Sequence, residues 1–374
     1  MQLNRNTEKR MKVLFTTNFP SPYRTDFFNE LGKYCDLTVA FERRKALHRD
    51  EKWTGNPAVN FKEVYLDLKP VGTSQSKGLG IVKYLAENKF DVTVFCGYAS
   101  PSVIAAMEYC RFRKIPYYIE FDGGFFRKGS FLKNLIKRHV TKNAKGNFIT
   151  CKETEKFLKE LGVPEQNLFR YPFSSVYEKD IIEKPLTAEE KKAMKSKLGI
   201  KEEKAVVSVG RFIYVKAFDE LLKASKNLGG EVGVYIIGGE PTEEYISICK
   251  ENNLKNVHFY PFCEKEKVYE WYKAADFFAF TTRGDVWGLV INEAMACGLP
   301  IISSDMCIAA RELVDESNGA IYRSGNIDQL GEYMKDFAAK DLSVYSENSL
   351  KKIRRYTIEE MAKKHMEILQ KEDL

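Results

Sequence analysis

Residues 284–302 read GDVWGLVINEAMACGLPII, and this stretch decides how the second half of the chain is interpreted. An acid, Asp285, is followed after seven residues by a second acid, Glu293. Between them, Gly288-Leu289-Val290 is typical of a tight turn that opens a helix, where unpaired backbone N–H groups attract anions. Glu293 then lies about one turn into that helix. The pattern predicts a seat for a diphosphate, with carboxylates placed to bind sugar hydroxyls.

Short apolar runs alternate with helical patterns on both sides of this motif. Such alternation predicts an α/β architecture with parallel sheets, in which ligands bind at the carboxyl ends of the strands. A charged helix that starts with a capping box at Thr187 separates two series of strands. We expect strands at 12–17, 37–41, 91–96 and 116–121 in the first series, and at 205–209, 232–237, 257–260, 276–281 and 300–303 in the second.

Composition places the chain among ordinary globular proteins and favours two domains. Its 374 residues are 44% apolar and 30% charged. Residues 1–180 hold 31 basic and 20 acidic residues, so the first half is the candidate for an anionic surface or substrate. The eight cysteines have no close pairing, the four histidines have no zinc spacing, and no apolar run approaches a bilayer span. We therefore expect a cytoplasmic protein with reduced thiols.

Two cations follow the predicted strand 205–209. Arg211 and Lys216 lie in the segment VGRFIYVK, with four residues between them. A guanidinium and an ammonium on one loop can clamp a diphosphate and neutralise the charge that grows as it leaves. Taken alone, they are also explained as solvated surface cations.

Together these motifs resemble those of the retaining GT-B glycosyltransferases of glycosyltransferase family 4, the group 1 glycosyltransferases. The resembling features are Val209-Gly210-Arg211 with Lys216, the acid pair Asp285 and Glu293, Gly288-Leu289-Val290, Glu293-Ala294-Met295-Ala296 and Gly298-Leu299-Pro300-Ile301-Ile302. The resemblance is strong over about residues 200–335 and weaker before them. It implies a GT-B fold with two Rossmann-like domains that face each other across a cleft.

The resemblance also implies domain boundaries. Residues 1–175 would form an acceptor-binding Rossmann-like domain, and residues 176–355 would form a nucleotide-sugar-binding one. The final segment, 356–374, would contain a helix at 358–370 that packs back on the first domain.

The resemblance assigns the diphosphate to cations and amides of the second domain. Arg211 and Lys216 would hold the diphosphate. The amides of Leu289 and Val290, which follow Gly288, would add contacts at the start of the helix.

The resemblance assigns the two acids to the sugars of the donor. Glu293 would bind the ribose hydroxyls, a role that suits the acceptor oxygens of a carboxylate. The first acid would bind the donor sugar, and here the chain departs from the family, because the usual Glu is Asp285. The alternative is that Asp285 only caps the helix.

In the first domain, the family places one polar group beneath the donor sugar, after a strand. The corresponding segment is 116–124, and the family's histidine position falls on Asp122. Asp122 could accept a proton from the acceptor or stabilise positive charge at the anomeric carbon. Glu120 lies on the same face of the strand and is the alternative, while a plain turn at Asp122-Gly123-Gly124 explains the segment without any function.

The loop 18–24 occupies the position of the family's first loop but contains prolines where the family has glycines. Its P-S-P-Y-R pattern resembles the branch that acts on polysaccharide and lipid-linked acceptors. Tyr23 and Arg24 are therefore expected to contact the acceptor, as is Glu120 of the segment 116–124, and Arg24 could bind an acceptor phosphate.

Residues 127–145 contain seven basic residues and no acid. Apolar residues recur there at helical spacing, which predicts either a membrane-surface helix or a surface helix whose apolar stripe joins the domain core. The resemblance favours core packing for the stripe and leaves the basic face as a candidate for lipid contact.

The sequence thus predicts a retaining, metal-independent hexosyltransferase. It would move a sugar from a UDP- or GDP-linked donor to a glycan or lipid-linked acceptor in cell-surface polysaccharide or glycoconjugate synthesis. The alternatives are a nucleotide-sugar epimerase of the same fold and a non-catalytic glycan or membrane scaffold. We expect no cofactor, no metal and no nucleic-acid partner, and a cytoplasmic protein that is peripheral on the inner face of the cell membrane.

Overall fold

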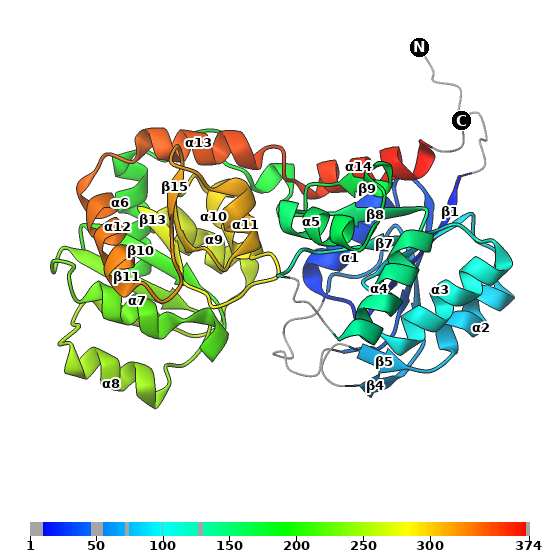
Figure 1. Cartoon of the computed structure of the whole chain (residues 1–374). Helices are drawn as coiled ribbons and strands as arrows, with labels where there is room; N and C mark the ends of the chain where they lie inside the picture. The colour runs from blue at the N-terminus through cyan, green and yellow to red at the C-terminus, as the bar shows by residue number, and fades with distance from the viewer. Residues whose placement is uncertain (1–9, 46–54, 72–74, 99, 126–129, 372–374) are drawn as a thin grey trace, which may run out of the picture. The chain divides into compact units, whose positions relative to one another are not determined.

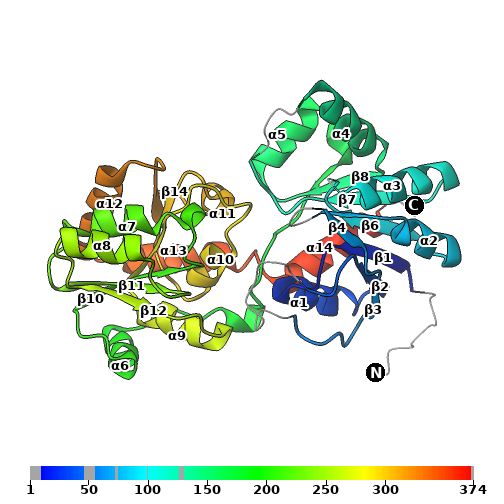
Figure 2. The same ribbon diagram turned by 90° about the horizontal axis from the view of Figure 1, so that it is seen from below.

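The structure is a computed structural model that describes residues 10–45, 55–71, 75–98, 100–125 and 130–371. The chain divides into two compact units (Figures 1 and 2). The N-terminal unit comprises Met1–Phe173 with Ile358–Leu374, and the C-terminal unit comprises Ser174–Thr357. In each unit a parallel sheet is covered by helices, which confirms the predicted α/β architecture.

The described part of the N-terminal unit contains a seven-stranded sheet in the order β3-β2-β1-β6-β7-β8-β9, with every pairing parallel. Its strands are β1 (Lys12–Thr17), β2 (Asp36–Phe41), β3 (Lys62–Tyr65), β6 (Val92–Cys96), β7 (Tyr117–Glu120), β8 (Gly146–Ile149) and β9 (Leu168–Arg170). A separate two-stranded antiparallel sheet is formed by β4 (Lys69–Val71) and β5 (Gln75–Lys77).

Helices cover both faces of this sheet (Figure 2). They are α1 (Pro22–Leu31), α2 (Gly80–Glu87), α3 (Pro101–Arg113), α4 (Phe131–Asn143), α5 (Lys152–Glu160), the 3-10 turn η1 (Glu165–Asn167) and α14 (Ile358–Gln370). Because side chains alternate along a strand, Leu14 of β1 joins the core that includes α2 and α3, whereas the ring of Phe15 contacts residues of α1 and α14.

The last helix, α14, lies beside α1 (Figures 1 and 2) and completes the core on that face of the sheet. Its His365 is fully buried and stacks on Phe148 of β8, with 4.5 Å between the ring centroids. The rings of Phe27 and Tyr171 lie 4.8 and 4.6 Å from the same imidazole. Helix α14 is therefore part of the hydrophobic core of the N-terminal unit.

The apolar stripe of α4 is not part of the core, and the expectation that it packs inward is wrong. Phe131, Leu132, Leu135 and Ile136 are 85%, 65%, 51% and 41% exposed. Among the apolar residues of this helix, all of which are described, Val140 alone is buried. The helix meets its neighbours through another face, so periodicity correctly indicated a stripe but not its direction.

The basic segment 127–145 is described only in part. Arg127 and Lys128 lie outside the described residues. The other basic residues of the segment are Lys133, Lys137, Arg138, Lys142 and Lys145, and the first four belong to α4.

The described C-terminal unit contains a six-stranded sheet in the order β12-β11-β10-β13-β14-β15, again parallel throughout. Its strands are β10 (Lys204–Val209), β11 (Val232–Ile237), β12 (Val257–Tyr260), β13 (Phe277–Phe280), β14 (Ile301–Ser304) and β15 (Gly319–Tyr322). Its helical segments are η2 (Glu178–Asp180), α6 (Ala188–Leu198), η3 (Tyr214–Lys216), α7 (Phe218–Ser225), α8 (Glu243–Glu251), α9 (Lys265–Ala274), α10 (Leu289–Ala296), α11 (Ile308–Leu313), α12 (Ile327–Ala339) and α13 (Ser343–Ile353). The capping box of Thr187 with Glu190 forms as predicted.

In each sheet, successive strands are first added on one side of the starting strand and then on the other side. In the N-terminal unit the chain runs outward from β1 through β2 and β3, and then returns to β6 on the other side of β1. In the C-terminal unit it runs from β10 through β11 and β12, and then returns to β13. Loops that leave such neighbouring strands diverge, and ligands of α/β proteins bind in the resulting crevice. The loops after β10 and β13, which carry the predicted donor residues, lie at such a reversal.

We predict that His365→Ala lowers the stability of the N-terminal unit by about 3 kcal/mol, because it removes a buried ring that contacts four aromatic side chains. The measurement is the unfolding transition by calorimetry. Lys363→Ala, on an exposed face of the same helix, is the matched control and should change stability by less than about 0.5 kcal/mol. Equal effects of the two substitutions would contradict a structural role for the buried ring.

Candidate active site

An ion pair joins the two predicted halves of the donor site. The ammonium of Lys216 lies 2.5 Å from a carboxylate oxygen of Asp285, and both side chains are largely buried. The same ammonium lies 4.9 Å from the ring centroid of Phe280, which adds a cation–π contact. The lysine and the first acid of the motif, 69 positions apart in the chain, are thus in direct contact.

The loops after β10 and β13 are tied together by their own polar groups. The hydroxyls of Thr281 and Thr282 donate to the backbone carbonyls of Lys216 and Val215 at 3.1 and 2.9 Å. The amide of Arg283 also donates to the carbonyl of Val215, at 2.8 Å. Since β10 and β13 are neighbours in the sheet, these bonds hold the two loops together at the reversal of strand order.

The turn before α10 requires a glycine. Gly288 has a φ of +101°, and a Cβ atom there would lie 2.6 Å from the sulfur of Cys307. Gly288 is the N-cap of α10, and no side chain caps this helix. The interpretation of Asp285 as a helix cap is therefore wrong, and its carboxylate binds Lys216 instead.

The start of α10 presents free backbone donors. Leu289 and Val290 occupy its first turn, where backbone N–H groups lack intrahelical acceptors. Because no side chain caps the helix, these amides can serve an anion.

Close packing of backbone shapes the loop that carries Arg211. A Cβ atom at Gly238, after β11, would lie 2.3 Å from the carbonyl oxygen of Gly210. The amide of Ile213 donates to the carbonyl of Arg211 at 2.8 Å, and that of Lys216 donates to Ile213 at 2.9 Å. The turn thus carries the exposed Arg211 at its start and Lys216 at its end.

The second acid of the motif lies in a polar cluster that the sequence did not indicate. Glu293 accepts hydrogen bonds from the hydroxyls of Ser175 and Tyr272 at 3.0 and 3.3 Å. Burial raises the pKa of its carboxyl, and the nearby ammonium of Lys265 opposes that rise. A carboxylate has about four lone-pair directions, so two hydrogen bonds leave acceptor capacity for a ligand hydroxyl.

In the N-terminal unit, Arg24 binds two carboxylates from the end of β7. Its guanidinium donates to both oxygens of Glu120 at 2.9 and 3.0 Å, and also to Asp122. Arg24 and Glu120 are buried, whereas the side chain of Asp122 is 29% exposed. Asp122 is therefore the accessible end of a buried charged network, next to Gly123 and Gly124, which both have positive φ.

Arg24 reaches this network because α1 starts within the segment that was predicted to be a loop. The helix begins at Pro22, which puts Tyr23 and Arg24 in its first turn. Proline is favoured there because its missing N–H would have no helical partner. The ring of Tyr23 packs edge-on against Phe173 at 5.7 Å, and burial raises the pKa of Tyr23 to about 12.

The two carboxyls of this network differ in their acidity. Burial raises the pKa of Glu120, but the charge of Arg24 and the adjacent imidazole of His365 outweigh burial and hold that pKa well below its usual range. Burial also raises the pKa of Asp122, and the negative charge of Glu120 adds to that rise, against the lowering effect of Arg24. The buried acid therefore holds its charge, while the accessible acid has a raised affinity for protons.

His365 of α14 is a further member of this network and contacts Glu120. Its Nε2 lies 3.4 Å from Glu120 Oε1, and its Nδ1 donates to the carbonyl of Met361 at 2.8 Å. The thiol of Cys96 donates to Glu120 at 3.3 Å. This role of His365 was missed, because its only sequence signal was a lone histidine in the final amphipathic helix.

The predicted acceptor residues differ in their access to a ligand. Tyr23 is partly exposed, and its contact with an acceptor stays a prediction. Arg24 and Glu120 are buried and bound to each other, and their contact with an acceptor also stays a prediction. What their placement supports is a role in positioning Asp122.

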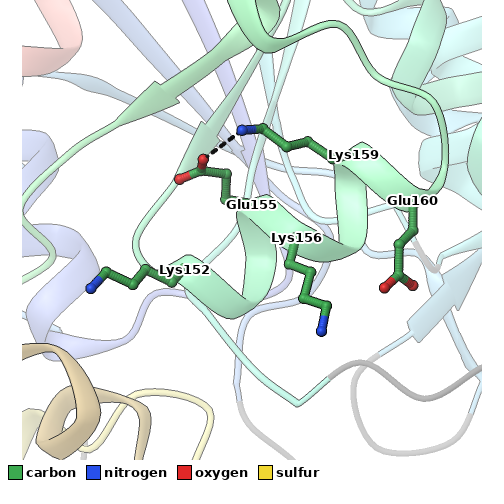
Figure 3. Close-up of a pocket in the computed structure, with 5 residues that line it drawn as sticks. All are labelled: Lys152, Glu155, Lys156, Lys159 and Glu160. Carbon is green, nitrogen blue, oxygen red and sulfur yellow. Dashed lines mark ion pairs between the residues drawn. The ribbon is translucent and has the colours of Figure 1, made fainter.

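A surface hollow lies elsewhere in the N-terminal unit, along α5 (Figure 3). It is lined by Lys152, Glu155, Lys156, Lys159 and Glu160 of that single helix. Glu155 pairs with Lys159 at 2.9 Å, so part of this charge is neutralised locally (Figure 3). None of these residues belongs to the predicted site.

A comparison with known protein families finds a match that contains the residues of the ion pair in the C-terminal unit. Residues 190–360 match the family model described as "Glycosyl transferases group 1". This segment is similar to the group 1 glycosyltransferases, and we call it the group 1 domain. The match contains Arg211, Lys216, Asp285 and Glu293, so the ion pair lies within the group 1 domain.

Two curated relatives match over part of the chain. The chain is 28% identical over 144 residues to a D-inositol 3-phosphate glycosyltransferase of Xylanimonas cellulosilytica, covering 37% of this chain and 34% of the relative. It is 30% identical over 161 residues to a GDP-mannose-dependent monoacylated alpha-(1-6)-phosphatidylinositol monomannoside mannosyltransferase of Corynebacterium glutamicum, covering 40% and 42% of the two chains. The match thus spans about a third to two fifths of the length of these relatives.

Solved structures show that the shared fold extends beyond the group 1 domain. Anabaena Alr3699/HepE in complex with UDP superposes with a TM-score of 0.76 at 15% identity, over 96% of this chain and 99% of that one. The fold is GT-B, with two Rossmann-like domains, as the sequence predicted. Within the described ranges, none of the helices combines the length and hydropathy that a bilayer span requires.

We predict that Gly288→Ala destabilises the group 1 domain by about 1–3 kcal/mol, because alanine disfavours the positive φ and its Cβ clashes with Cys307. Thermal unfolding measures the change. Two matched controls separate the causes: Gly325→Ala has positive φ but open space, and Gly284→Ala has neither constraint. The expected order of destabilisation is Gly288, then Gly325, then Gly284, and a neutral Gly288→Ala would contradict the packing described here.

We predict that Glu120→Gln flattens the acid side of the stability profile of the N-terminal unit. The pKa of Glu120 is lowered in the folded state, so its contribution is fully present above the unfolded pKa of about 4.3 and is lost as the pH falls toward the lower folded pKa. Asp122, whose pKa is raised, acts in the opposite sense. Urea unfolding between about pH 6 and pH 3 tests this, with exposed Glu160→Gln as the control. An unchanged pH slope in Glu120→Gln would contradict the assignment.

Proposed function

We propose that this protein is a glycosyltransferase that moves a sugar from a nucleoside diphosphate sugar to a hydroxyl of a glycan or lipid-linked acceptor. The observation that carries the proposal is the contact of Lys216 with Asp285. This contact lies close to the start of α10, whose N-cap is Gly288, and inside the group 1 domain. A cation, a carboxylate and unpaired amides that follow the carboxyl ends of neighbouring strands suit a ligand that joins a diphosphate to a sugar.

The C-terminal unit would bind the donor. Lys216 and Arg211 would bind the diphosphate together with the amides of the first turn of α10. Glu293 would accept hydrogen bonds from the ribose, and Asp285 would accept them from the donor sugar. Because Asp285 holds Lys216 in this structure, the diphosphate would compete with a carboxylate for that ammonium.

The cations would also supply catalysis. As the bond between the anomeric carbon and the diphosphate breaks, negative charge grows on the leaving group and positive charge grows on the sugar ring. Lys216 and Arg211 would stabilise the leaving group, the role that a divalent metal takes in other transferases. We therefore propose a metal-independent reaction.

Asp122 of the N-terminal unit would act on the sugar ring. An ionised carboxylate near the anomeric carbon stabilises the developing positive charge, and Arg24 fixes the position of this one. In a retaining reaction, the acceptor oxygen bonds to the anomeric carbon on the face that the diphosphate leaves. The acceptor proton would then pass to an oxygen of the departing diphosphate.

The printed descriptions of related proteins suggest the substrate classes. HepE was solved with UDP, and the Corynebacterium glutamicum relative is described as a GDP-mannose-dependent mannosyltransferase of a phosphatidylinositol mannoside. We propose a UDP- or GDP-linked hexose as donor and an acceptor that carries a glycan or a lipid. The eight cysteines, which all lie in described residues, are free thiols, and this supports a reaction in the cytoplasm.

The test is a donor screen in which UDP- and GDP-sugars are incubated with and without lipid-linked acceptors while nucleoside diphosphate release is measured. We predict that Lys216→Ala lowers turnover by about 10²–10³-fold, as removal of a group that stabilises developing charge does. Asp122→Asn should lower turnover while leaving nucleotide affinity within about threefold of the wild type. Lys226→Ala, which removes an exposed lysine of the same unit as Lys216, is the control.

Each outcome of the screen distinguishes one alternative. Release that requires an acceptor supports transfer, whereas a changed sugar without acceptor supports an epimerase. Nucleotide binding without turnover of any donor supports a scaffold. Near-normal turnover in Lys216→Ala would remove the basis of the proposed clamp.

A further inference from the structure

Helix α4 turns its large apolar side chains toward solvent. Phe131 and Leu135 are four residues apart and therefore lie on the same face of the helix, and Leu132 and Ile136 lie next to them. All four are exposed. Four large apolar side chains gathered on one helix form a patch of the kind that marks an interaction surface.

The inward face of α4 is the more polar one. The ammonium of Lys137 lies 5.4 Å from the ring centroid of Phe157 and 5.9 Å from that of Tyr98. Val140 is buried, and its carbonyl accepts a hydrogen bond from the hydroxyl of Tyr117 at 2.9 Å. The unit therefore holds α4 through a lysine, a valine and backbone, and leaves the larger apolar residues in solvent.

A polar contact with α3 fixes the helix from the side. Nε2 of His139 lies 2.8 Å from Oε1 of Glu108. The carboxylate of Glu108 also pairs with Arg111 of its own helix at 2.8 Å. Glu108 is thus already bound to two partners on this side of α4.

The exposed charge on the helix itself is positive. Lys133, Arg138 and Lys142 are exposed on α4, and residues 131–143 contain no acid. Arg138 and Lys142 follow Leu135 at helical spacings of three and seven, so they continue the exposed apolar stripe. The stripe is therefore apolar at the start of the helix and basic toward its end.

This combination matches the chemistry of an anionic lipid surface. Apolar side chains can enter the acyl region, while the flanking lysine and arginine reach phosphates in the headgroup layer. A protein partner would need an acidic rim around an apolar groove, whereas an anionic membrane presents both features everywhere.

We propose that α4 docks the N-terminal unit on an anionic lipid membrane, with Phe131 and Leu135 entering the interface and Arg138 and Lys142 binding lipid phosphates. Figure 2 shows α4 and α5 at one edge of this unit. If the proposed function is correct, this membrane is where the enzyme would bind a lipid-linked acceptor. Only this biological role of the docking rests on the proposed function. Binding itself needs neither donor nor acceptor.

The test is co-sedimentation of the full chain with phosphatidylcholine vesicles, with and without about 30% phosphatidylglycerol. We expect binding to the anionic vesicles alone, weakened at high salt. Phe131→Ser with Leu135→Ser, and separately Arg138→Glu with Lys142→Glu, should each weaken binding at least about tenfold.

Matched controls lie on other helices of the same unit. Phe112→Ser removes an apolar side chain of α3 that is 81% exposed. Lys83→Glu with Lys89→Glu reverses two exposed charges in and after α2. Both control proteins should bind anionic vesicles like the wild type.

A second measurement separates insertion from simple charge attraction. In Phe131→Trp, fluorescence should be quenched by brominated acyl chains, while Phe112→Trp should show no added quenching. Binding that the α4 variants leave unchanged, or an absence of vesicle binding, overturns the proposal. So does self-association of the wild type that Phe131→Ser with Leu135→Ser abolishes, because a second copy would then cover the patch. A negative result with nucleotide release intact would leave the proposed transferase standing.

Discussion

The contact between Lys216 and Asp285 is the interaction around which the C-terminal unit is organised. It needs β10 and β13 to be neighbours, and it needs the hydroxyls of Thr281 and Thr282 to join the loops that follow them. It also needs Gly288, because a larger residue would displace the turn that carries Asp285. The sheet order and these close contacts thus place one cation and one anion where a helix begins.

The N-terminal unit also contains a network of ion pairs, but most of that network is buried. Arg24, Glu120 and His365 are buried, and Asp122 is the accessible member of this network. A buried ion pair is costly to assemble and costly to break, so it fixes geometry more than it adds stability. Since His365 belongs to α14, the last helix of the chain supports the position of a side chain that follows β7.

Much of the architecture was predictable, because buried parallel strands are short, apolar and bounded by turns. β1, β11, β12 and α14 have the predicted bounds. The edge strand β3, which is exposed or half-exposed along its length, carries no such signal and was missed. The strands β8, β9 and β15 were missed as well, although β8 is buried throughout. The motif around Asp285 was recognisable because it depends on local chemistry, namely a glycine turn and spaced acids. Other parts of the site depend on tertiary contacts: nothing in the sequence shows that Arg24 turns inward to Glu120, and the periodicity of α4 identifies a face but not what that face meets.

The most direct test of the central claim is calorimetric binding of UDP and GDP to the wild type, Lys216→Met and Asp285→Asn. If Lys216 binds the diphosphate and is held by Asp285 until the nucleotide arrives, Lys216→Met should weaken binding at least about tenfold. Asp285→Asn should bind the nucleotide as tightly as the wild type or more tightly, because a competing carboxylate is gone. Unchanged affinity in Lys216→Met, or an equal loss in both variants, would contradict the account.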